Sequence, residues 1–154
     1  MRLALYQPDI PQNLGAAIRL AACLGVGLDV IEPCGFPLTQ RSLKRTALDY
    51  AERANVAHHV SFEAFRSAPE RSGGRLVLVE TDGTRSFQSF AFSTGDTLIL
   101  GRESAGSPRE LYAAAEASVR VPMAAGVRSL NVVTAGAIVL TEAMRQIGAW
   151  EKLS

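Results

Sequence analysis

Short apolar runs recur along the chain and give the first indication of its fold. Five of them are rich in leucine and β-branched residues: Leu3–Tyr6, Leu28–Glu32, Leu76–Glu80, Thr97–Gly101 and Ser118–Pro122. Apolar and polar positions do not alternate within these runs, which is typical of parallel strands buried on both faces. Helix-length segments lie between most of the runs. The pattern therefore predicts an α/β fold, with an open, mostly parallel sheet and helices on both of its faces.

The C-terminal segment, Val119 to Gly148, has the most distinctive pattern in the chain. A short strand leads into a glycine-containing loop and then into a polar cluster of Arg128, Ser129 and Asn131. The helix that follows is apolar almost all the way round, which predicts burial in a core or an interface. The polar cluster lies at the N-terminus of this helix, where unpaired backbone N–H groups favour a ligand.

Local signals predict where other helices begin and end. We expect Asn13 to cap the first helix and Gly25 to end it. A second helix is predicted to begin near Thr39, and a short one to span Ser61–Ala68. The stretch Ser107–Glu110 matches a capping box with proline at the first helical position, so a further helix is expected to start there.

Size and charge narrow the possible functions without choosing one. The 154 residues suit one domain, and 47% apolar with 20% charged residues is ordinary for a globular chain. A net charge of +1 means that any nucleic-acid site must be a local patch. No signal peptide or membrane span is recognisable, so we expect a cytoplasmic protein. Cys23 and Cys34 lack metal-site or redox spacing and are expected to be free, buried thiols.

Two further features are weak signals when taken alone. Arg41, Lys44 and Arg45 share one face of the predicted second helix, a pattern that by itself indicates only a solvated surface. The glycine-rich turn Gly101–Gly106 follows the fourth strand, but it matches neither the P-loop nor G-x-G-x-x-G. By itself, this turn predicts only a tight connection.

Three stretches taken together are far more specific. P-Q-N-L-G-A-A-I-R (Pro11–Arg19), I-L-G-R-E-S-A-G-S-P (Ile99–Pro108) and V-P-M…R-S-L-N-V-V-T-A (Val121–Ala135) closely resemble the three motifs of the SpoU branch of the SPOUT RNA methyltransferases. The intervening I-E-P-C-G-F-P and L-K-R-T-A-L-D-Y resemble the small tRNA (cytidine/uridine) 2′-O-methyltransferases of the anticodon wobble position. The resemblance covers essentially the whole chain.

This resemblance implies a fold and an activity that periodicity does not reveal. Residues 1–154 are expected to form a single SPOUT methyltransferase domain with a C-terminal trefoil knot, active as a homodimer. The implied reaction is 2′-O-methylation of tRNA nucleotide 34, a cytidine or uridine. S-adenosyl-L-methionine is the implied methyl donor and S-adenosyl-L-homocysteine the product. The resemblance implies no metal, membrane or obligatory protein partner.

The family's cofactor contacts fall on a defined set of positions in this chain. They are Val79, Glu80, Thr81, Gly101, Val121, Met123, Ser129, Leu130 and Asn131. Apolar side chains at such positions suit a slot for a flat adenine ring. Gly101 is expected to let the backbone approach the cofactor where a Cβ atom would collide with it. Glu103 is expected to bond loop N–H groups and so hold the glycine-rich turn.

The resemblance also assigns catalytic residues. Arg19 corresponds to the family's catalytic arginine, but a guanidinium with a pKa above about 12 is a poor base. We therefore expect it to hold a neighbouring phosphate and stabilise the developing alkoxide. Asn13 is expected to orient Arg19 or the ribose, and Ser129 with Asn131 to hold the cofactor and the target ribose. Without the motif, Arg19 would be read as an ordinary surface arginine.

The RNA contacts and the competing interpretations follow from the same residues. Arg41, Lys44, Arg45 and Arg128 become candidates for a phosphate-binding patch. One alternative is methylation of another RNA, such as ribosomal RNA. A second is a non-catalytic RNA-binding protein of the same fold. A small-molecule enzyme on a Rossmann-like sheet is a third, disfavoured by the absence of G-x-G-x-x-G.

Overall fold

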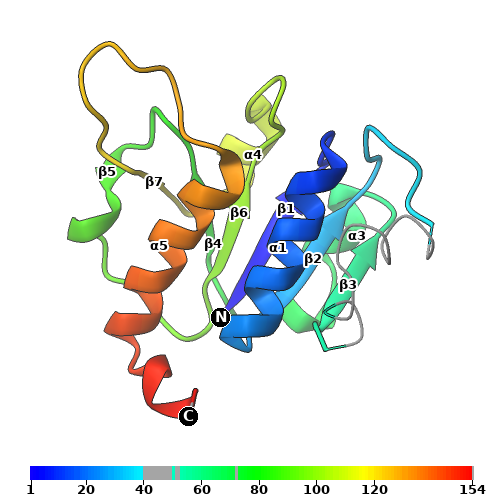
Figure 1. The fold of residues 1–154 in the computed structure, drawn as a ribbon, viewed down its shortest axis with the longest axis horizontal. Coiled ribbons are helices and arrows are strands. Elements are labelled where there is room, and N and C mark those ends of the chain that lie inside the picture. The colour runs from blue at the N-terminus through cyan, green and yellow to red at the C-terminus, as the bar shows by residue number, and fades with distance from the viewer. Residues whose placement is uncertain (40–49, 51–52, 72, 154) are drawn as a thin grey trace.

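A seven-stranded sheet organises the molecule (Figure 1). The computed structural model describes residues 1–39, 50, 53–71 and 73–153. The strands are β1 (Arg2–Tyr6), β2 (Gly27–Ile31), β3 (Val56–His59), β4 (Leu76–Val79), β5 (Arg85–Ser86), β6 (Thr97–Leu100) and β7 (Ala117–Arg120). Their order across the sheet is β3-β2-β1-β6-β4-β7-β5, and all six pairings are parallel. The predicted parallel sheet is therefore confirmed. Each of the five predicted runs overlaps one strand, and its two ends differ from the ends of that strand by at most two residues.

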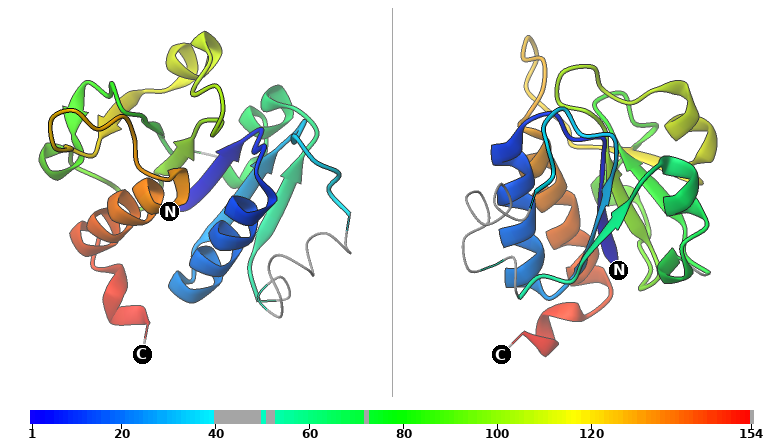
Figure 2. Two further views of the ribbon diagram at one scale, coloured as in Figure 1. Left: turned by 45° about the horizontal axis from the view of Figure 1, so that its top comes forward. Right: turned by 90° about the vertical axis from the view of Figure 1, so that its right-hand side faces the viewer.

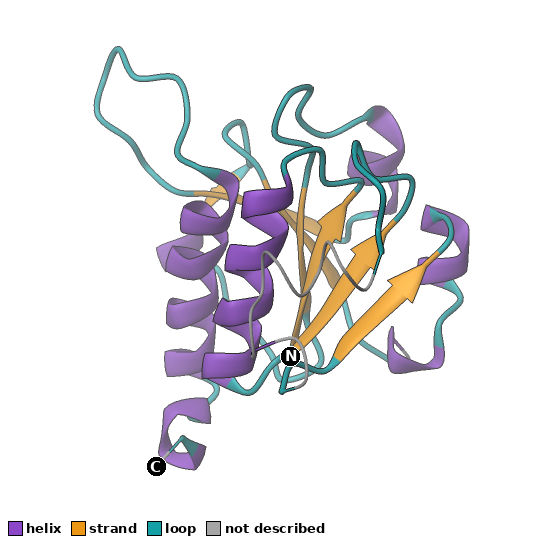
Figure 3. Ribbon diagram, turned by 45° about the vertical axis from the view of Figure 1, so that its right-hand side comes forward, coloured by secondary structure: helices purple, strands orange, loops and turns teal. Residues whose placement is uncertain are grey.

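Helices cover both faces of the sheet, as predicted. Helices α1 (Pro11–Leu24) and α5 (Val132–Gln146) pack side by side on one face, while α3 (Phe62–Arg66) and α4 (Arg109–Ala114) lie on the other (Figures 2 and 3). Single turns of 3-10 helix occur at Pro69–Arg71, Phe87–Ser89 and Ala149–Lys152. The helix predicted to begin near Thr39 falls mainly on residues 40–49, outside the described residues. No helix of the described part is long and apolar enough to cross a membrane.

The two faces of the sheet create two separate cores. Along β1, Leu3 and Leu5 pack toward α1 and α5, whereas Ala4 and Tyr6 pack toward α3 and α4. Successive strand side chains point to opposite faces, so a strand covered on both sides must be apolar at every position. The four residues of β4 and the four of β6 are all buried. This explains why the strand sequences do not alternate.

Several helices begin at other residues than the local sequence signals predicted. Helix α1 begins at Pro11, so Asn13 lies inside its first turn and the prediction that Asn13 caps it was wrong. Proline suits that first position because its missing N–H would be unpaired there anyway. Gly25 ends the helix in the left-handed conformation, with φ of 63°, as predicted. Ser107 does not cap α4, which begins at Arg109; its hydroxyl bonds to Glu80 instead.

Two strands and both cysteines also depart from expectation. The edge strand β3, which matches none of the predicted runs, contains His58 and His59. His59 is buried, and its Nε2 lies 2.8 Å from Oδ1 of the fully buried Asp29. The two-residue β5 was not predicted at all. Both cysteines are free, as predicted, but neither is buried, since Cys23 is exposed and Cys34 is half-buried.

Candidate active site

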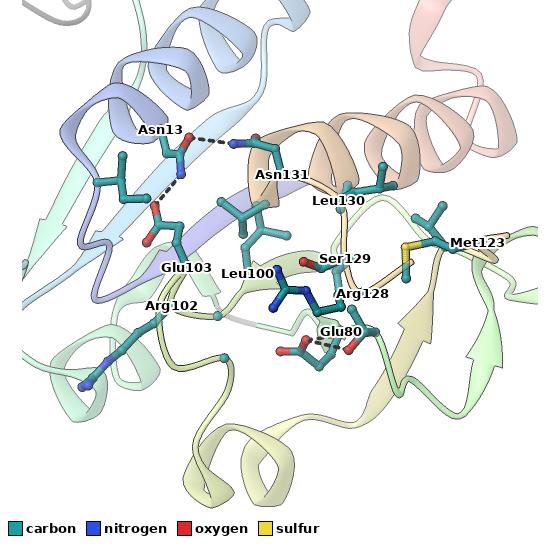
Figure 4. Close-up of a pocket in the computed structure, with 18 residues that line it drawn as sticks. Asn13, Glu80, Leu100, Arg102, Glu103, Met123, Arg128, Ser129, Leu130 and Asn131 are labelled. Carbon is teal, nitrogen blue, oxygen red and sulfur yellow. Dashed lines mark hydrogen bonds between the residues drawn. The ribbon is translucent and has the colours of Figure 1, made fainter. Parts of the chain in front are cut away.

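A cavity of about 360 Å³ opens at the carboxyl ends of β4 and β6 (Figure 4). Its remaining walls come from the start of α1, the segment after β7 and the first turn of α5. The residues that line it are Ile10, Asn13, Val79, Glu80, Thr81, Leu100, Gly101, Arg102, Glu103, Gly106, Val121, Met123, Arg128, Ser129, Leu130, Asn131, Val132 and Ala135. The chain leaves β1 toward one edge of the sheet and β6 toward the other. Ligand sites of open parallel sheets form at such a reversal.

A chain of hydrogen bonds runs along one end of the cavity. Asn131 precedes α5, and its Oδ1 accepts from the backbone N–H groups of Val133 and Thr134, at 3.0 and 3.2 Å. Its amide nitrogen donates to Asn13 Oδ1 at 2.9 Å, and the Asn13 amide nitrogen donates to Glu103 Oε1 at 3.0 Å (Figure 4). Residues from all three sequence motifs are thus joined directly, across 118 positions of sequence between Asn13 and Asn131.

A second carboxylate is held in the opposite wall. Glu80 Oε2 accepts a hydrogen bond of 2.7 Å from the Ser107 hydroxyl, and Oε1 accepts one of 3.0 Å from the backbone N–H of Thr81. Gly101 lies beneath this contact, and a Cβ atom there would collide with Ser107 Oγ. The glycine is therefore required by packing of the protein against itself. That a Cβ at this position would also meet the cofactor stays a prediction.

Two neighbouring carboxyl groups have shifted pKa values. Burial raises the pKa of Glu103, and the carboxyl group of the adjacent Asp9 raises it further, whereas the hydrogen bonds from the Asp9 backbone N–H and the Asn13 amide lower it. The pKa of Asp9 is lowered, chiefly by its hydrogen bond with Glu103 and then by those from Ser104. The Asp9 backbone N–H also donates to Glu103 Oε2 at 3.0 Å. Two acids this close favour one ionised and one more readily protonated group.

The structure brings most of the predicted site residues together around this cavity. Among its walls are Asn13, Val79, Glu80, Thr81, Gly101, Val121, Met123, Ser129, Leu130 and Asn131. Arg128 lies at the exposed rim, while Arg102 points away from the cavity and stacks over the Tyr6 ring (Figure 4). Arg41, Lys44 and Arg45 lie outside the described residues.

Arg19 is the predicted catalytic residue that does not line the cavity. It is exposed on α1, with its guanidinium carbon 4.9 Å from the centre of the Tyr50 ring. Six helical positions separate it from Asn13, which places it about 240° further round the helix and about 9 Å further along it. Asn13 bonds to Glu103 and Asn131 instead. It does not orient Arg19 within this chain.

Sequence reasoning missed other parts of the site. Asp9 was not singled out, although it lies only two residues before the first motif. Glu103 was expected to bond N–H groups of its own glycine-rich turn, but it bonds the N–H of Asp9 in a different loop. The apolar wall residues Ile10, Leu100 and Val132 were also missed, because apolar residues beside a motif look like ordinary core. Among the described residues, no group of acidic, histidine and cysteine side chains could hold a metal ion.

An open parallel sheet with a cavity at the carboxyl ends of its central strands is the arrangement in which α/β proteins usually bind small organic ligands. Comparison with known proteins identifies the family. The family model described as "SpoU rRNA Methylase family" matches residues 1–141, and the chain belongs to this family.

Similar proteins match almost the full length of the chain. A tRNA (cytidine(34)-2′-O)-methyltransferase of Beijerinckia indica is 49% identical over 151 residues, which are 98% of this chain and 94% of that protein. A solved structure described as "Structural insights into the 2-OH methylation of C/U34 on tRNA" is 41% identical, with a TM-score of 0.86 and 94% of each chain covered. The SpoU methyltransferase AviRb of Streptomyces viridochromogenes, solved with AdoMet, is 27% identical, with a TM-score of 0.80, covering 95% of this chain and 60% of its own.

Proposed function

We propose that the protein transfers a methyl group from S-adenosyl-L-methionine to the ribose 2′-hydroxyl of tRNA nucleotide 34, a cytidine or uridine. The observation that carries this proposal is the single cavity formed by all three motifs, with Asn13, Glu103 and Asn131 bonded to one another in its wall. Full-length similarity to tRNA (cytidine(34)-2′-O)-methyltransferases supports the choice of substrate.

The cavity suits this methyl donor chemically. Val79, Val121 and Met123 give an apolar wall of the kind that binds a flat adenine ring. The carboxyl groups of Glu80 and Glu103 face the same space, where they would favour a ligand carrying a positive sulfonium. When bound, this group supplies the activated methyl carbon. Ser129 and Asn131, at the N-terminus of α5, would hold the donor and the acceptor ribose.

Catalysis requires alignment and removal of a proton. An in-line displacement gains most from holding the hydroxyl oxygen opposite the leaving sulfur. We assign Arg19 the role of holding the adjacent phosphate and stabilising the developing alkoxide. Because Arg19 lies outside the cavity of its own chain, this assignment favours action as a homodimer, in which Arg19 of one chain serves the cavity of the other. The homodimer, the trefoil knot and a cytoplasmic location are parts of the same proposal.

The reaction can be tested directly. The protein is incubated with labelled S-adenosyl-L-methionine and total tRNA from a strain that lacks it, and the methylated nucleotide is mapped by mass spectrometry. Label on the ribose of nucleotide 34 is expected. Label in ribosomal RNA alone would replace the proposed substrate, and no incorporation into any RNA would favour a non-catalytic RNA-binding protein.

The proposed RNA patch gives a separate prediction. Replacing Arg41 and Arg45 by alanine should weaken tRNA binding most at low salt, because each lost phosphate contact removes about 0.7 to 0.9 from the slope of log affinity against log salt concentration. Cofactor affinity should not change. Filter binding between low and high salt measures the slope, with Arg66→Ala, an exposed cation on α3, as the control. Equal slopes for the double variant and the wild type would remove these residues from the RNA surface.

A further inference from the structure

The hydrogen-bond chain at the end of the cavity has only one possible direction. The backbone N–H groups at the start of α5 can only donate, so Asn131 must turn its oxygen toward them. Its amide nitrogen therefore faces Asn13, and the Asn13 nitrogen in turn faces Glu103. Every donor in the chain points toward Glu103. The series of hydrogen bonds ends on Glu103, because an ionised carboxylate has no hydrogen to donate and can only accept.

Glu103 is held by both of its oxygens. Oε1 accepts from the Asn13 amide and Oε2 accepts from the backbone N–H of Asp9, each at 3.0 Å. Asp9 is itself fixed by Ser104, whose hydroxyl and backbone N–H both donate to Asp9 Oδ2. Each carboxylate oxygen has a second lone pair, so Glu103 keeps the capacity to accept a proton from a ligand in the cavity.

The position of Glu103 also fits a displacement reaction. Met123, one of the residues proposed to hold the cofactor, lies on the other side of the cavity, whereas Glu103 lies at the end formed by α1 and α5 (Figure 4). An attacking oxygen must lie opposite the leaving sulfur, and therefore at the end away from the donor wall. Glu80 belongs to the donor wall, where Thr81 and Ser107 hold it. The two arginines of the lining are too basic to accept a proton.

We propose that Glu103 accepts the proton of the ribose 2′-hydroxyl, and that Asp9 and Asn13 are positioning residues that act through Glu103. This inference rests on the proposed methyl transfer. In the step, a bond forms between the 2′-oxygen and the methyl carbon while the bond from that carbon to sulfur breaks. The electron pair stays on sulfur, which becomes a neutral thioether, and the hydroxyl proton passes to the Glu103 carboxylate and from there to solvent.

The charged groups around Glu103 determine how its protonation responds to substitution. Burial and Asp9 raise the pKa of Glu103, and Asn13 opposes them, so the carboxyl is a stronger base than an exposed glutamate. The other titratable groups that face it or share its cavity are Asp9, Cys34, Glu80, Arg102 and Arg128. Only Asp9 and Asn13 contact its carboxyl group directly among the described side chains.

The first test removes the carboxylate while keeping its shape. Glu103→Gln should lower kcat by about 10²- to 10⁴-fold, the usual contribution of a general base. Calorimetric affinity for S-adenosyl-L-homocysteine and the affinity for tRNA should each stay within about threefold of wild type, because amide and carboxylate fill the same volume. Glu110→Gln, a matched change at a glutamate that bonds Tyr6 outside this cavity, should retain activity. A Glu103→Gln variant with near wild-type kcat would overturn the proposal.

The second test separates positioning from structural damage by the sign of a pH shift. Asp9→Asn removes a negative neighbour, so the pKa of Glu103 falls and the acidic limb of the kcat profile moves to lower pH. Asn13→Ala removes a hydrogen bond to the ionised form, so the pKa rises and the limb moves to higher pH. General destabilisation does not move the limb in opposite directions. Shifts of the same sign, or no shift in either variant, would contradict the roles of Asp9 and Asn13.

A readout independent of turnover distinguishes this inference from the proposed function. Titration of ¹³C-labelled glutamate carboxyls by NMR, with the Glu103 signal identified by its loss in Glu103→Gln, should show the same two opposite shifts. Wild-type protein without methyl transfer at any pH would overturn the proposed function and, with it, the role of Glu103. Normal methyl transfer with an unshifted Glu103 titration in both variants would overturn this inference alone.

Discussion

An Arg19→Ala variant is expected to bind S-adenosyl-L-methionine as tightly as the wild type and to lose tRNA methylation by at least about 100-fold in kcat, the usual loss when one stabilising donor is removed. Cofactor affinity is preserved because Arg19 is exposed on α1 and contributes nothing to the lining of its own cavity. Calorimetry with the cofactor and single-turnover methylation of tRNA measure the two effects separately. Near-normal turnover would remove Arg19 from the mechanism.

Two further variants define how Arg19 acts. Arg19→Lys keeps the charge but not the planar fork that grips a phosphate with two hydrogen bonds, so partial activity is expected. Co-expression of Arg19→Ala with Ser129→Ala tests whether the arginine serves the partner's cavity. Random pairing in a two-fold dimer would then restore about a quarter of the wild-type sites, since each mixed dimer regains one intact site. No recovery would mean that each Arg19 serves its own chain.

A Gly101→Ala variant is expected to lose at least about tenfold in cofactor affinity and about 1 to 3 kcal/mol in the free energy of unfolding, the usual effect of overpacking a tight interior. The new methyl group would collide with Ser107 Oγ and press on the Gly106 backbone. The turn that carries Glu103 must then move outward, and the bond from Ser107 to Glu80 is lost with it.

Calorimetry with S-adenosyl-L-methionine and urea unfolding measure these two effects. Gly95→Ala is the matched control, because a Cβ there would make only ordinary contact with Gly74. Adding Ser107→Ala to Gly101→Ala should recover part of the stability by removing the hydroxyl from the collision. Wild-type cofactor affinity in Gly101→Ala would show that the turn adapts without changing the cavity.

The apolar runs predicted the sheet well because strands buried on both faces must be apolar at every position. Strand β3 was missed for the same reason. Its sequence V-A-H-H contains two polar residues, and His59 is buried only because Asp29 on β2 and Phe65 on α3 contact it. Partners from distant segments are invisible to a local pattern. The order of the strands likewise depends on long-range pairing, such as that of β1 with β6.

The motifs located the cavity, but they did not reveal how its residues contact one another. Asparagine is a residue type that often caps helices, so Asn13 was predicted to be a cap. The helix already starts at Pro11, which frees the Asn13 amide for Glu103 and Asn131. Asp9 carries no signal of its own, because its importance comes from contact with Glu103 and Ser104, some ninety positions later. Side-chain partners of this kind depend on tertiary packing, which single-sequence rules do not contain.

Strand β4 is synthesised before either of its neighbours. In the finished sheet it lies between β6 and β7, both of which follow it in the chain. While only the residues up to Val79 have emerged from the ribosome, the nascent chain therefore exposes an apolar strand with two unpaired edges, a template for wrong pairing. Residues up to Leu100 must emerge before the first correct partner is available, and residues up to Arg120 before the second. Chaperone binding during synthesis is expected to be strongest while the residues between Val79 and Arg120 emerge.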